Sequence, residues 1–152
     1  MEEQLEQRKK VLQYRGELEK LARYIPWLQS KQGQQLVSTF SGNDIEKNSL
    51  TFPVYDGTLM GFVKEAAATE LMNRNYLYDY RKYRIKDAAD EEKFIAVATV
   101  REWNVLCSIL SYYVLKGMTK TTLWNEGVSN GIMLKVLLKM KDIVEFWDKP
   151  LA

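Results

Sequence analysis

The residues best suited to chemistry form a short stretch in the middle of the chain. From Leu71 to Ile85 the sequence LMNRNYLYDYRKYRI interleaves tyrosines with basic side chains. Bases of single-stranded nucleic acids stack on aromatic rings while Arg and Lys neutralise phosphates, so this composition suits single-strand binding. The cations of such a site, or of a site for another partner, are Arg74, Arg81, Lys82 and Arg84.

Helical geometry gives the same stretch a second interpretation, which we favour. Tyr76, Tyr80 and Tyr83 fall at i, i+4 and i+7, which is the spacing of a single buried stripe on a helix. A buried tyrosine needs only a partner for its hydroxyl. Nucleic-acid binding by residues 74–86 is therefore an alternative, but a disfavoured one, and the basic face of this helix can still meet an acidic partner.

Histidine is absent from all 152 residues. Histidine is the usual general base near neutral pH and the commonest metal ligand, so its absence removes most hydrolase mechanisms and ordinary zinc sites. An enzyme would have to use carboxylates, such as Asp79, Glu102 and Glu126, alone or with Mg²⁺. Each of these lies at a polar position of a predicted helix. An ordinary role as a solvent-exposed surface residue explains each of them equally well. We therefore predict no catalytic residue, no metal site and no cofactor.

Composition and charge indicate one soluble domain, residues 1–152. Hydrophobic residues make up 46% and charged residues 28%, and the net charge is +2, so neither disorder nor a strongly charged partner is indicated. No apolar run approaches the roughly 18 residues of a membrane span, and the start MEEQLEQRKK lacks the apolar core of a signal peptide. We expect a cytoplasmic protein with no membrane partner, in which the single cysteine, Cys107, is an inert apolar residue.

Apolar residues recur at spacings of three and four along most of the chain, which predicts an all-α fold. We expect a single compact domain of about five to six helices with one long polar loop. Residues 2–24 read as one helix that Pro26 ends. Its apolar stripe either forms a homodimer through a short coiled coil or packs within the monomer, which we favour. The stripe consists of Val11, Tyr14, Leu18, Leu21 and Ile25.

The rest of the chain divides at turn residues and helix caps. Residues 29–49 are predicted to form the long loop, and residues 50–55 an extended entry into a helix that Asp56 caps. The acidic run 87–92 is expected to be a solvated helix start. Gly117 is expected at the left-handed position after a helix, and Asn130-Gly131 after a short one. The predicted core consists of Leu18, Leu21, Phe62, Val63, Tyr80, Ile109, Leu110, Trp124, Val136, Leu137 and Met140.

Several of these landmarks resemble an uncharacterised bacterial family that is known only as a domain of unknown function. The similar segments are LARYIPWL, FPVYDGTLMGFVKEA, NYLYDYRKY, LCSILSYYVLKG and LWNEGVSNGIMLKVLLKMKDI, which together span about residues 18–143. They include the Ile-Pro-aromatic motif at Ile25 and the spacing from Trp124 to Gly131. The chain departs from the family pattern at Leu115–Thr119, where family members carry a charged turn. The resemblance implies an α-helical fold and no particular activity.

The sequence therefore favours a small cytoplasmic module that binds another protein. The possible partner-binding residues are Trp27, Arg74, Arg81, Lys82 and Arg84. The alternatives are a carboxylate-based or Mg²⁺-dependent enzyme and a nucleic-acid-binding protein that uses the tyrosine-rich helix.

Overall fold

A computed structural model describes the backbone of residues 2–34, 37–41 and 51–148 and the side chains of residues 2–34 and 56–148. The helices in chain order are α1 (Glu2–Leu12), α2 (Arg15–Ala22), α3 (Ile25–Ser30), α4 (Gly57–Ala67), α5 (Tyr76–Lys82), α6 (Ala88–Val97), the 3₁₀ turn η1 (Val100–Glu102), α7 (Trp103–Ser111), the π-helical turn η2 (Tyr112–Lys116), α8 (Thr122–Ser129) and α9 (Ile132–Asp148). The strands are β1 (Val37–Ser41) and β2 (Thr51–Tyr55). The predicted all-α, single-domain class is confirmed, with one β-hairpin added to the helices.

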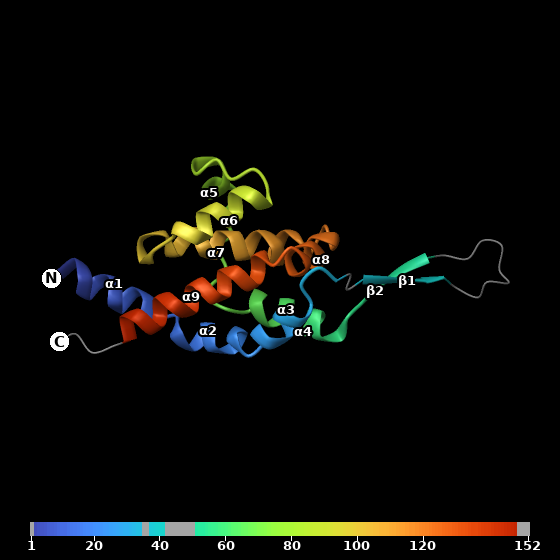
Figure 1. The fold of residues 1–152 in the computed structure, drawn as a ribbon, viewed down its shortest axis with the longest axis horizontal. Helices are drawn as coiled ribbons and strands as arrows, with labels where there is room; N and C mark the ends of the chain where they lie inside the picture. Colours follow the sequence, from blue (N-terminus) through green and yellow to red (C-terminus); the bar gives the residue numbers. More distant parts are fainter. Residues whose placement is uncertain (1, 35–36, 42–50, 149–152) are drawn as a thin grey trace.

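The long helix α9 forms the axis of the helical body (Figure 1). α1, α2, α3, α6, α7 and α8 pack against it, whereas α5 packs on α7, and α4 on α2 and η2. Its apolar stripe is fully buried at Val136, Leu137 and Met140. α1 and the end of α9 lie side by side at one end of the body, where Arg8 Nε donates to the Trp147 carbonyl at 2.8 Å. In the described ranges, none of the helices combines the length and the apolarity needed to span a bilayer.

The predicted single helix over residues 2–24 is wrong, because the chain forms two helices there and a third follows. A turn at Gln13 and Tyr14 separates α1 from α2. Pro26 does not end a helix, since it lies in the first turn of α3, where a missing backbone N–H costs nothing. Val11, Leu18 and Leu21 are buried within this chain, so the predicted homodimer, which stays a prediction, would require them to leave the core.

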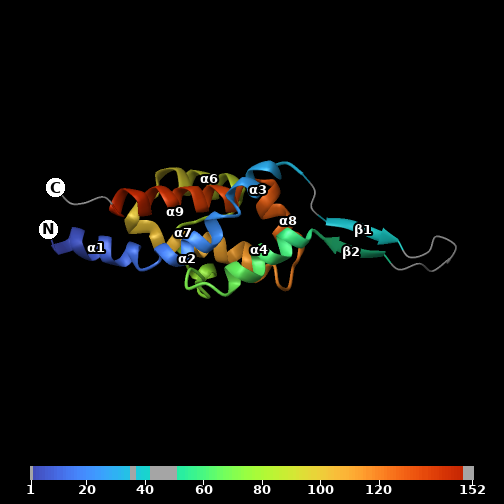
Figure 2. The same cartoon turned by 90° about the horizontal axis from the view of Figure 1, so that it is seen from below.

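The predicted long loop is also interrupted, because β1 and β2 pair as an antiparallel hairpin. The register runs from Val37 opposite Tyr55 to Ser41 opposite Thr51. Pro53 pairs with Thr39 inside β2, although proline removes one donor from the ladder, which is tolerated in an edge strand. Seen from two directions, the hairpin projects from the end of the body opposite the α1 start (Figures 1 and 2). Residues 35–36 and 42–49 of the expected loop, and residue 50 of the expected extended segment, lie outside the described residues.

Local capping explains where several helices begin and end. The carboxylate of Asp56 accepts hydrogen bonds from the backbone N–H groups of Thr58 and Leu59 at 2.7 and 3.2 Å, as predicted for an N-cap. Gly131 has φ +77° and ends α8 in the left-handed region, also as predicted. Gly117 has φ −60°, so the left-handed role predicted for it is wrong.

Nearly all of the predicted core is confirmed. Trp124 is 5% exposed, and Leu18, Leu21, Phe62, Val63, Ile109 and Leu110 are buried with it. Tyr80 is the exception, because its ring is only partly buried and faces a cavity. Tyr83 is 42% exposed and Tyr76 is half-buried, so the tyrosine stripe borders the core rather than lying inside it.

Candidate functional site

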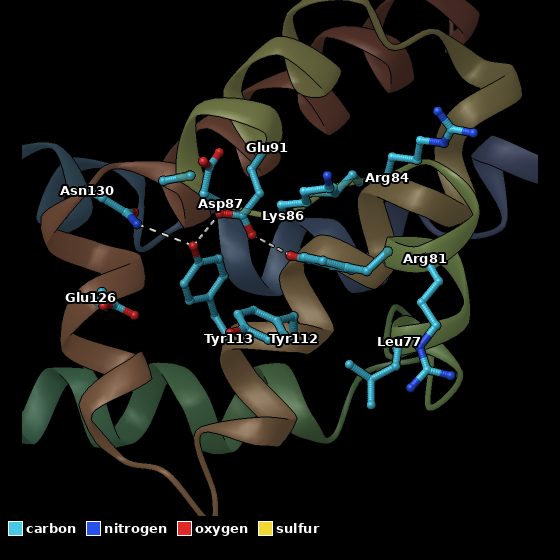
Figure 3. Close-up of a pocket in the computed structure, with 13 residues that line it drawn as sticks. Leu77, Arg81, Arg84, Lys86, Asp87, Glu91, Tyr112, Tyr113, Glu126 and Asn130 are labelled. Atoms are coloured by element: carbon cyan, nitrogen blue, oxygen red, sulfur yellow. Dashed lines mark hydrogen bonds between the residues drawn. The ribbon is translucent and has the colours of Figure 1, made fainter.

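A pocket of about 650 Å³ opens between α5, α6, η2 and α8 (Figure 3). We call it the tyrosine pocket. It is lined by Leu77, Tyr80, Arg81, Arg84, Ile85, Lys86, Asp87, Ala88, Glu91, Tyr112, Tyr113, Glu126 and Asn130. Its volume falls within the range typical of small-molecule sites, and it combines aromatic walls with a few converging polar groups.

A directed chain of hydrogen bonds crosses the pocket and ends on Glu91. The amide oxygen of Asn130 accepts from the backbone N–H of Ile132 at 2.9 Å, which fixes the orientation of the amide. Its Nδ2 therefore donates to the Tyr113 hydroxyl at 3.3 Å. That hydroxyl donates in turn to Glu91 Oε1 at 2.5 Å, and the Tyr80 hydroxyl donates to Glu91 Oε2. Because both hydroxyls donate, the Glu91 carboxylate offers only acceptor sites to anything else that enters.

Burial is the main cause of the pKa shifts along this series of hydrogen bonds. Glu91 is 2% exposed, and its desolvation raises the carboxyl pKa, while the hydroxyls of Tyr113 and Tyr80 counteract the rise by stabilising the charged form. Burial also raises the pKa of the Tyr80 and Tyr113 hydroxyls, and the nearby charge of Glu91 adds to that increase. Both phenols therefore remain protonated donors throughout the physiological range.

Tyr112 forms the centre of the aromatic wall. Its ring centroid lies 4.9 Å from that of Tyr80, 5.1 Å from Tyr113 and 6.1 Å from Tyr76. The Lys116 ammonium lies 5.5 Å from the centroid of the Tyr112 ring. Tyr112 is only half-buried, so part of its surface is available to stack on a planar ligand.

The π-helical turn η2 places the two neighbouring tyrosines at the pocket. A π turn inserts an extra residue into a helix and is frequent at functional sites. The carbonyl of Val114 within this turn accepts a hydrogen bond from the indole N–H of Trp124 at 3.1 Å. Gly127 lies so close that a Cβ there would come within 2.7 Å of the Tyr113 ring. The Tyr113 position therefore depends on glycine at residue 127.

Arg81, Arg84 and Lys86 supply positive charge to the same pocket. Within the part of the chain that the structure describes, none of their guanidinium or ammonium groups makes a hydrogen bond or an ion pair. Figure 3 shows Arg81 and Arg84 on one side of the tyrosines, and Glu126, Asn130 and Asp87 on the other. The pocket therefore has a basic side and an acidic side.

Arg84 also has an unusual backbone, with φ 55°. It follows the last turn of α5, where its N–H donates to the Arg81 carbonyl at 3.2 Å and the Ile85 N–H donates to the Tyr80 carbonyl at 2.9 Å. This pair of bonds is the Schellman motif, whose left-handed position usually holds glycine. An arginine there is strained, and strained residues are often found at functional sites.

The structure brings only some of the predicted binding residues together. Arg81 and Arg84 both line the tyrosine pocket, whereas Arg74 and Lys82 are exposed and are not among its lining residues. Trp27 is half-buried and borders a separate, shallower hollow with Arg23 and Tyr24.

The three predicted carboxylates are held by different neighbours. Asp79 accepts a hydrogen bond from Ser108 Oγ at 2.5 Å, and Glu102 accepts one from the backbone N–H of Thr99 at 2.8 Å in a capping box. Only Glu126 lines the pocket. Among the described residues, no three Asp, Glu or Cys side chains gather in a way that could hold a metal ion.

Sequence reasoning missed Glu91, Tyr112, Tyr113 and Asn130. The predicted solvated helix start is correct for Asp87, which caps α6 by accepting from the Asp90 N–H at 2.9 Å, but it is wrong for the buried Glu91. One signal was present, since Glu91 precedes the buried Ile95 by four residues and thus shares its helix face. The neighbours that hold Glu91 come from η2 and α5, and no local pattern reveals them.

Comparison with known proteins identifies no relative. No family model matches the chain, and neither a curated protein nor a solved structure is similar to it. The resemblance to a domain of unknown function therefore stays a prediction.

Proposed function

We propose that the protein acts by binding rather than by catalysis, and that the tyrosine pocket binds a small organic ligand. The observation that carries this proposal is a cavity of about 650 Å³ that is lined by a half-buried Tyr112 ring, a buried Glu91, and Arg81 and Arg84, which have no acidic partner among the described residues. Aromatic rings provide contact area at little entropic cost, and the charged groups provide orientation and specificity.

The nucleophiles and carboxylates that an enzyme would need give little support to catalysis. Burial raises the pKa of the Cys107 thiol to about 12, so the reactive thiolate is scarce at neutral pH. Ser108 donates to Asp79, but its neighbourhood holds no histidine because the chain has none. A hydroxyl paired only with a carboxylate lacks the base that usually activates a serine.

The experiment is a titration of the full chain with small aromatic compounds, followed by two-dimensional ¹H–¹⁵N NMR. We expect shift changes at amides of α5, α6, η2 and α8 that saturate with concentration. Tyr112→Ala should remove the binding, whereas Tyr78→Ala should not, because Tyr78 is 66% exposed and does not line the pocket. If no compound shifts the pocket amides of a folded wild-type protein, the proposal fails.

The β-hairpin supports a second candidate, the protein–protein interaction module expected from the sequence. β1 and β2 pair extensively with each other, and none of the helices packs against them to a similar extent. An isolated two-stranded hairpin is only marginally stable in water, and its outer edges can add a partner strand. Ser38→Pro should disrupt the pairing with Val54 and abolish capture of a defined protein partner from the source lysate, whereas Tyr112→Ala should preserve that capture.

Nucleic-acid binding remains the weaker proposal. Tyr76 and Tyr80 pack against Tyr112, so their rings are not free to stack on successive bases. A bacterial source and a cytoplasmic location belong to the proposed interaction module. The single cysteine, Cys107, has no partner for an internal disulfide, which agrees with a reducing compartment.

A further inference from the structure

We propose that the ligand of the tyrosine pocket is a flat organic anion with N–H donors at the end remote from its negative charge. The inference rests on the proposed binding function and specifies the chemistry of the ligand. It follows from the separation of two kinds of charge across one aromatic wall, shown in Figure 3.

The side formed by Glu91, Glu126 and Asn130 should attract donor groups. Glu91 already accepts hydrogen bonds from two tyrosine hydroxyls, and the Asn130 amide is held by the backbone N–H of Ile132. Among the described residues, no further side-chain donor bonds to the Glu91 carboxylate. The carboxylate of Glu126 adds negative charge close to Glu91. An anionic group would be repelled here, whereas an amino or amide N–H would complete the unfilled acceptor sites.

The opposite side should attract an anion. Arg81 and Arg84 come from the last turn of α5 and the residue after its C-cap, and in the described part of the chain their guanidinium groups have no acidic partner. Guanidinium groups bind carboxylates and phosphates through paired N–H donors. Arg84 has a left-handed backbone, with φ 55°, so the arginine occupies a position where glycine would be less strained.

The rings between the two sides determine the shape of the ligand. Tyr80 and Tyr112 lie 4.9 Å apart between centroids, with a 32° angle between their planes. A flat ring that stacks on Tyr112 would extend from the acidic side toward Arg81 and Arg84. A nucleotide has these features in its base and phosphate, and an aminoaryl carboxylate has them in a smaller molecule.

The test compares complete probes with probes that lack one end. Wild-type protein is titrated with guanosine 5′-monophosphate, guanosine and ribose 5-phosphate, and separately with 4-aminobenzoate, benzoate and aniline, with ¹H–¹⁵N NMR as the readout. We expect one complete probe to bind at least about 10-fold more tightly than either of its truncated forms, because each end contributes a charge-assisted hydrogen bond. The series with the tighter complete probe shows which source of this chemistry fits.

Variants assign each end of the probe to its side of the pocket. Arg84→Gly removes one charge, and glycine suits the left-handed backbone. The variant should therefore bind the complete probe about 2- to 5-fold more weakly, while its affinity for guanosine and for aniline stays unchanged. Arg74→Gln, a charge change outside the pocket, is the matched control and should have no effect. Glu91→Gln should reduce the preference for 4-aminobenzoate over benzoate, and if that variant does not fold, the wild-type probe comparison still decides.

Several results would overturn the inference. If the form without its anionic group binds as tightly as the complete probe in both series, the anion side is removed, and if the form without its N–H donors does so in both series, the donor side is removed. Binding of neutral aromatic compounds without any preference for a complete probe would overturn the inference but leave the proposed binding function intact. If no probe of any kind shifts the pocket amides, both fail.

Discussion

The phenol of Tyr113 donates a hydrogen bond to the carboxylate of Glu91 over 2.5 Å, and this bond joins the π turn η2 to the first half of α6. Glu91 is 2% exposed and accepts a second hydroxyl from Tyr80. A buried carboxyl costs free energy unless its acceptor sites are filled, so the two phenols are what permit an acidic residue at this place in the core.

The first prediction concerns the pH dependence of stability. Burial raises the folded-state pKa of Glu91 above its ordinary value of 4.5, so the folded protein holds this proton more tightly than the unfolded chain does. The resulting stabilisation is complete below 4.5 and is lost as the pH rises through the folded-state pKa. Thermal melts of wild type and Glu91→Gln should be recorded at pH values from below 4.5 upward. As the pH rises, the melting temperature of wild type should fall relative to that of the variant. A constant difference at every pH would contradict this.

The second prediction concerns the strained arginine. Arg84→Gly should raise the free energy of unfolding by about 0.5–1 kcal/mol, because glycine occupies the left-handed region without steric cost. Arg81→Gly removes the same charge from within α5 and should lower it by about 1 kcal/mol, since glycine disfavours a helix. Urea denaturation of both variants tests the pair. Destabilisation by Arg84→Gly would show that its side chain contributes to the fold.

The third prediction separates two tyrosines of the same stripe. Tyr80→Ala should lower the free energy of unfolding by about 2–4 kcal/mol, because its ring packs on Tyr112 and its hydroxyl fills an acceptor site of Glu91. Tyr83→Ala should cost less than about 1 kcal/mol, since the ring is 42% exposed, meets Phe94 edge-on and has the Lys82 ammonium 5.5 Å from its centroid. Equal losses in denaturant titrations would mean that the two rings are equally buried.

The fourth prediction concerns close packing around Trp124. A Cβ at Gly117 would come within 2.2 Å of the indole nitrogen of Trp124, so Gly117→Ala should destabilise the protein by about 1–3 kcal/mol through overpacking. A Cβ at Gly16, in α2, would have nothing within 4 Å apart from its chain neighbours and its own helix backbone, and Gly16→Ala should stabilise the protein by about 0.5–1 kcal/mol. Calorimetric melting temperatures shifted in opposite directions would confirm both, and a tolerated Gly117→Ala would show that Trp124 can move.

The sequence alone determined the features that depend on local spacing. Apolar residues spaced three and four positions apart predicted the helical class and most of the core, including Leu18, Phe62 and Val136. They did so because one face of each helix has to be buried. The cap at Asp56 and the helix end at Gly131 were also predictable, since each depends on the chemistry of one or two adjacent residues. The division between α1 and α2 was not predictable from the sequence, because the same apolar stripe continues across the turn.

The tertiary structure alone decided the pairing of β1 with β2 and the composition of the pocket. Strand pairing joins Val37 to Tyr55 across a segment of the chain, and such contacts leave little local trace in a sequence. Glu91 lies in an acidic run that looks solvated, and it is buried because Tyr80 and Tyr113, from other elements, donate to it. Local periodicity specifies which face of each helix is apolar, but only the packing of α5, α6 and η2 together decides which polar groups meet at the edge of the core.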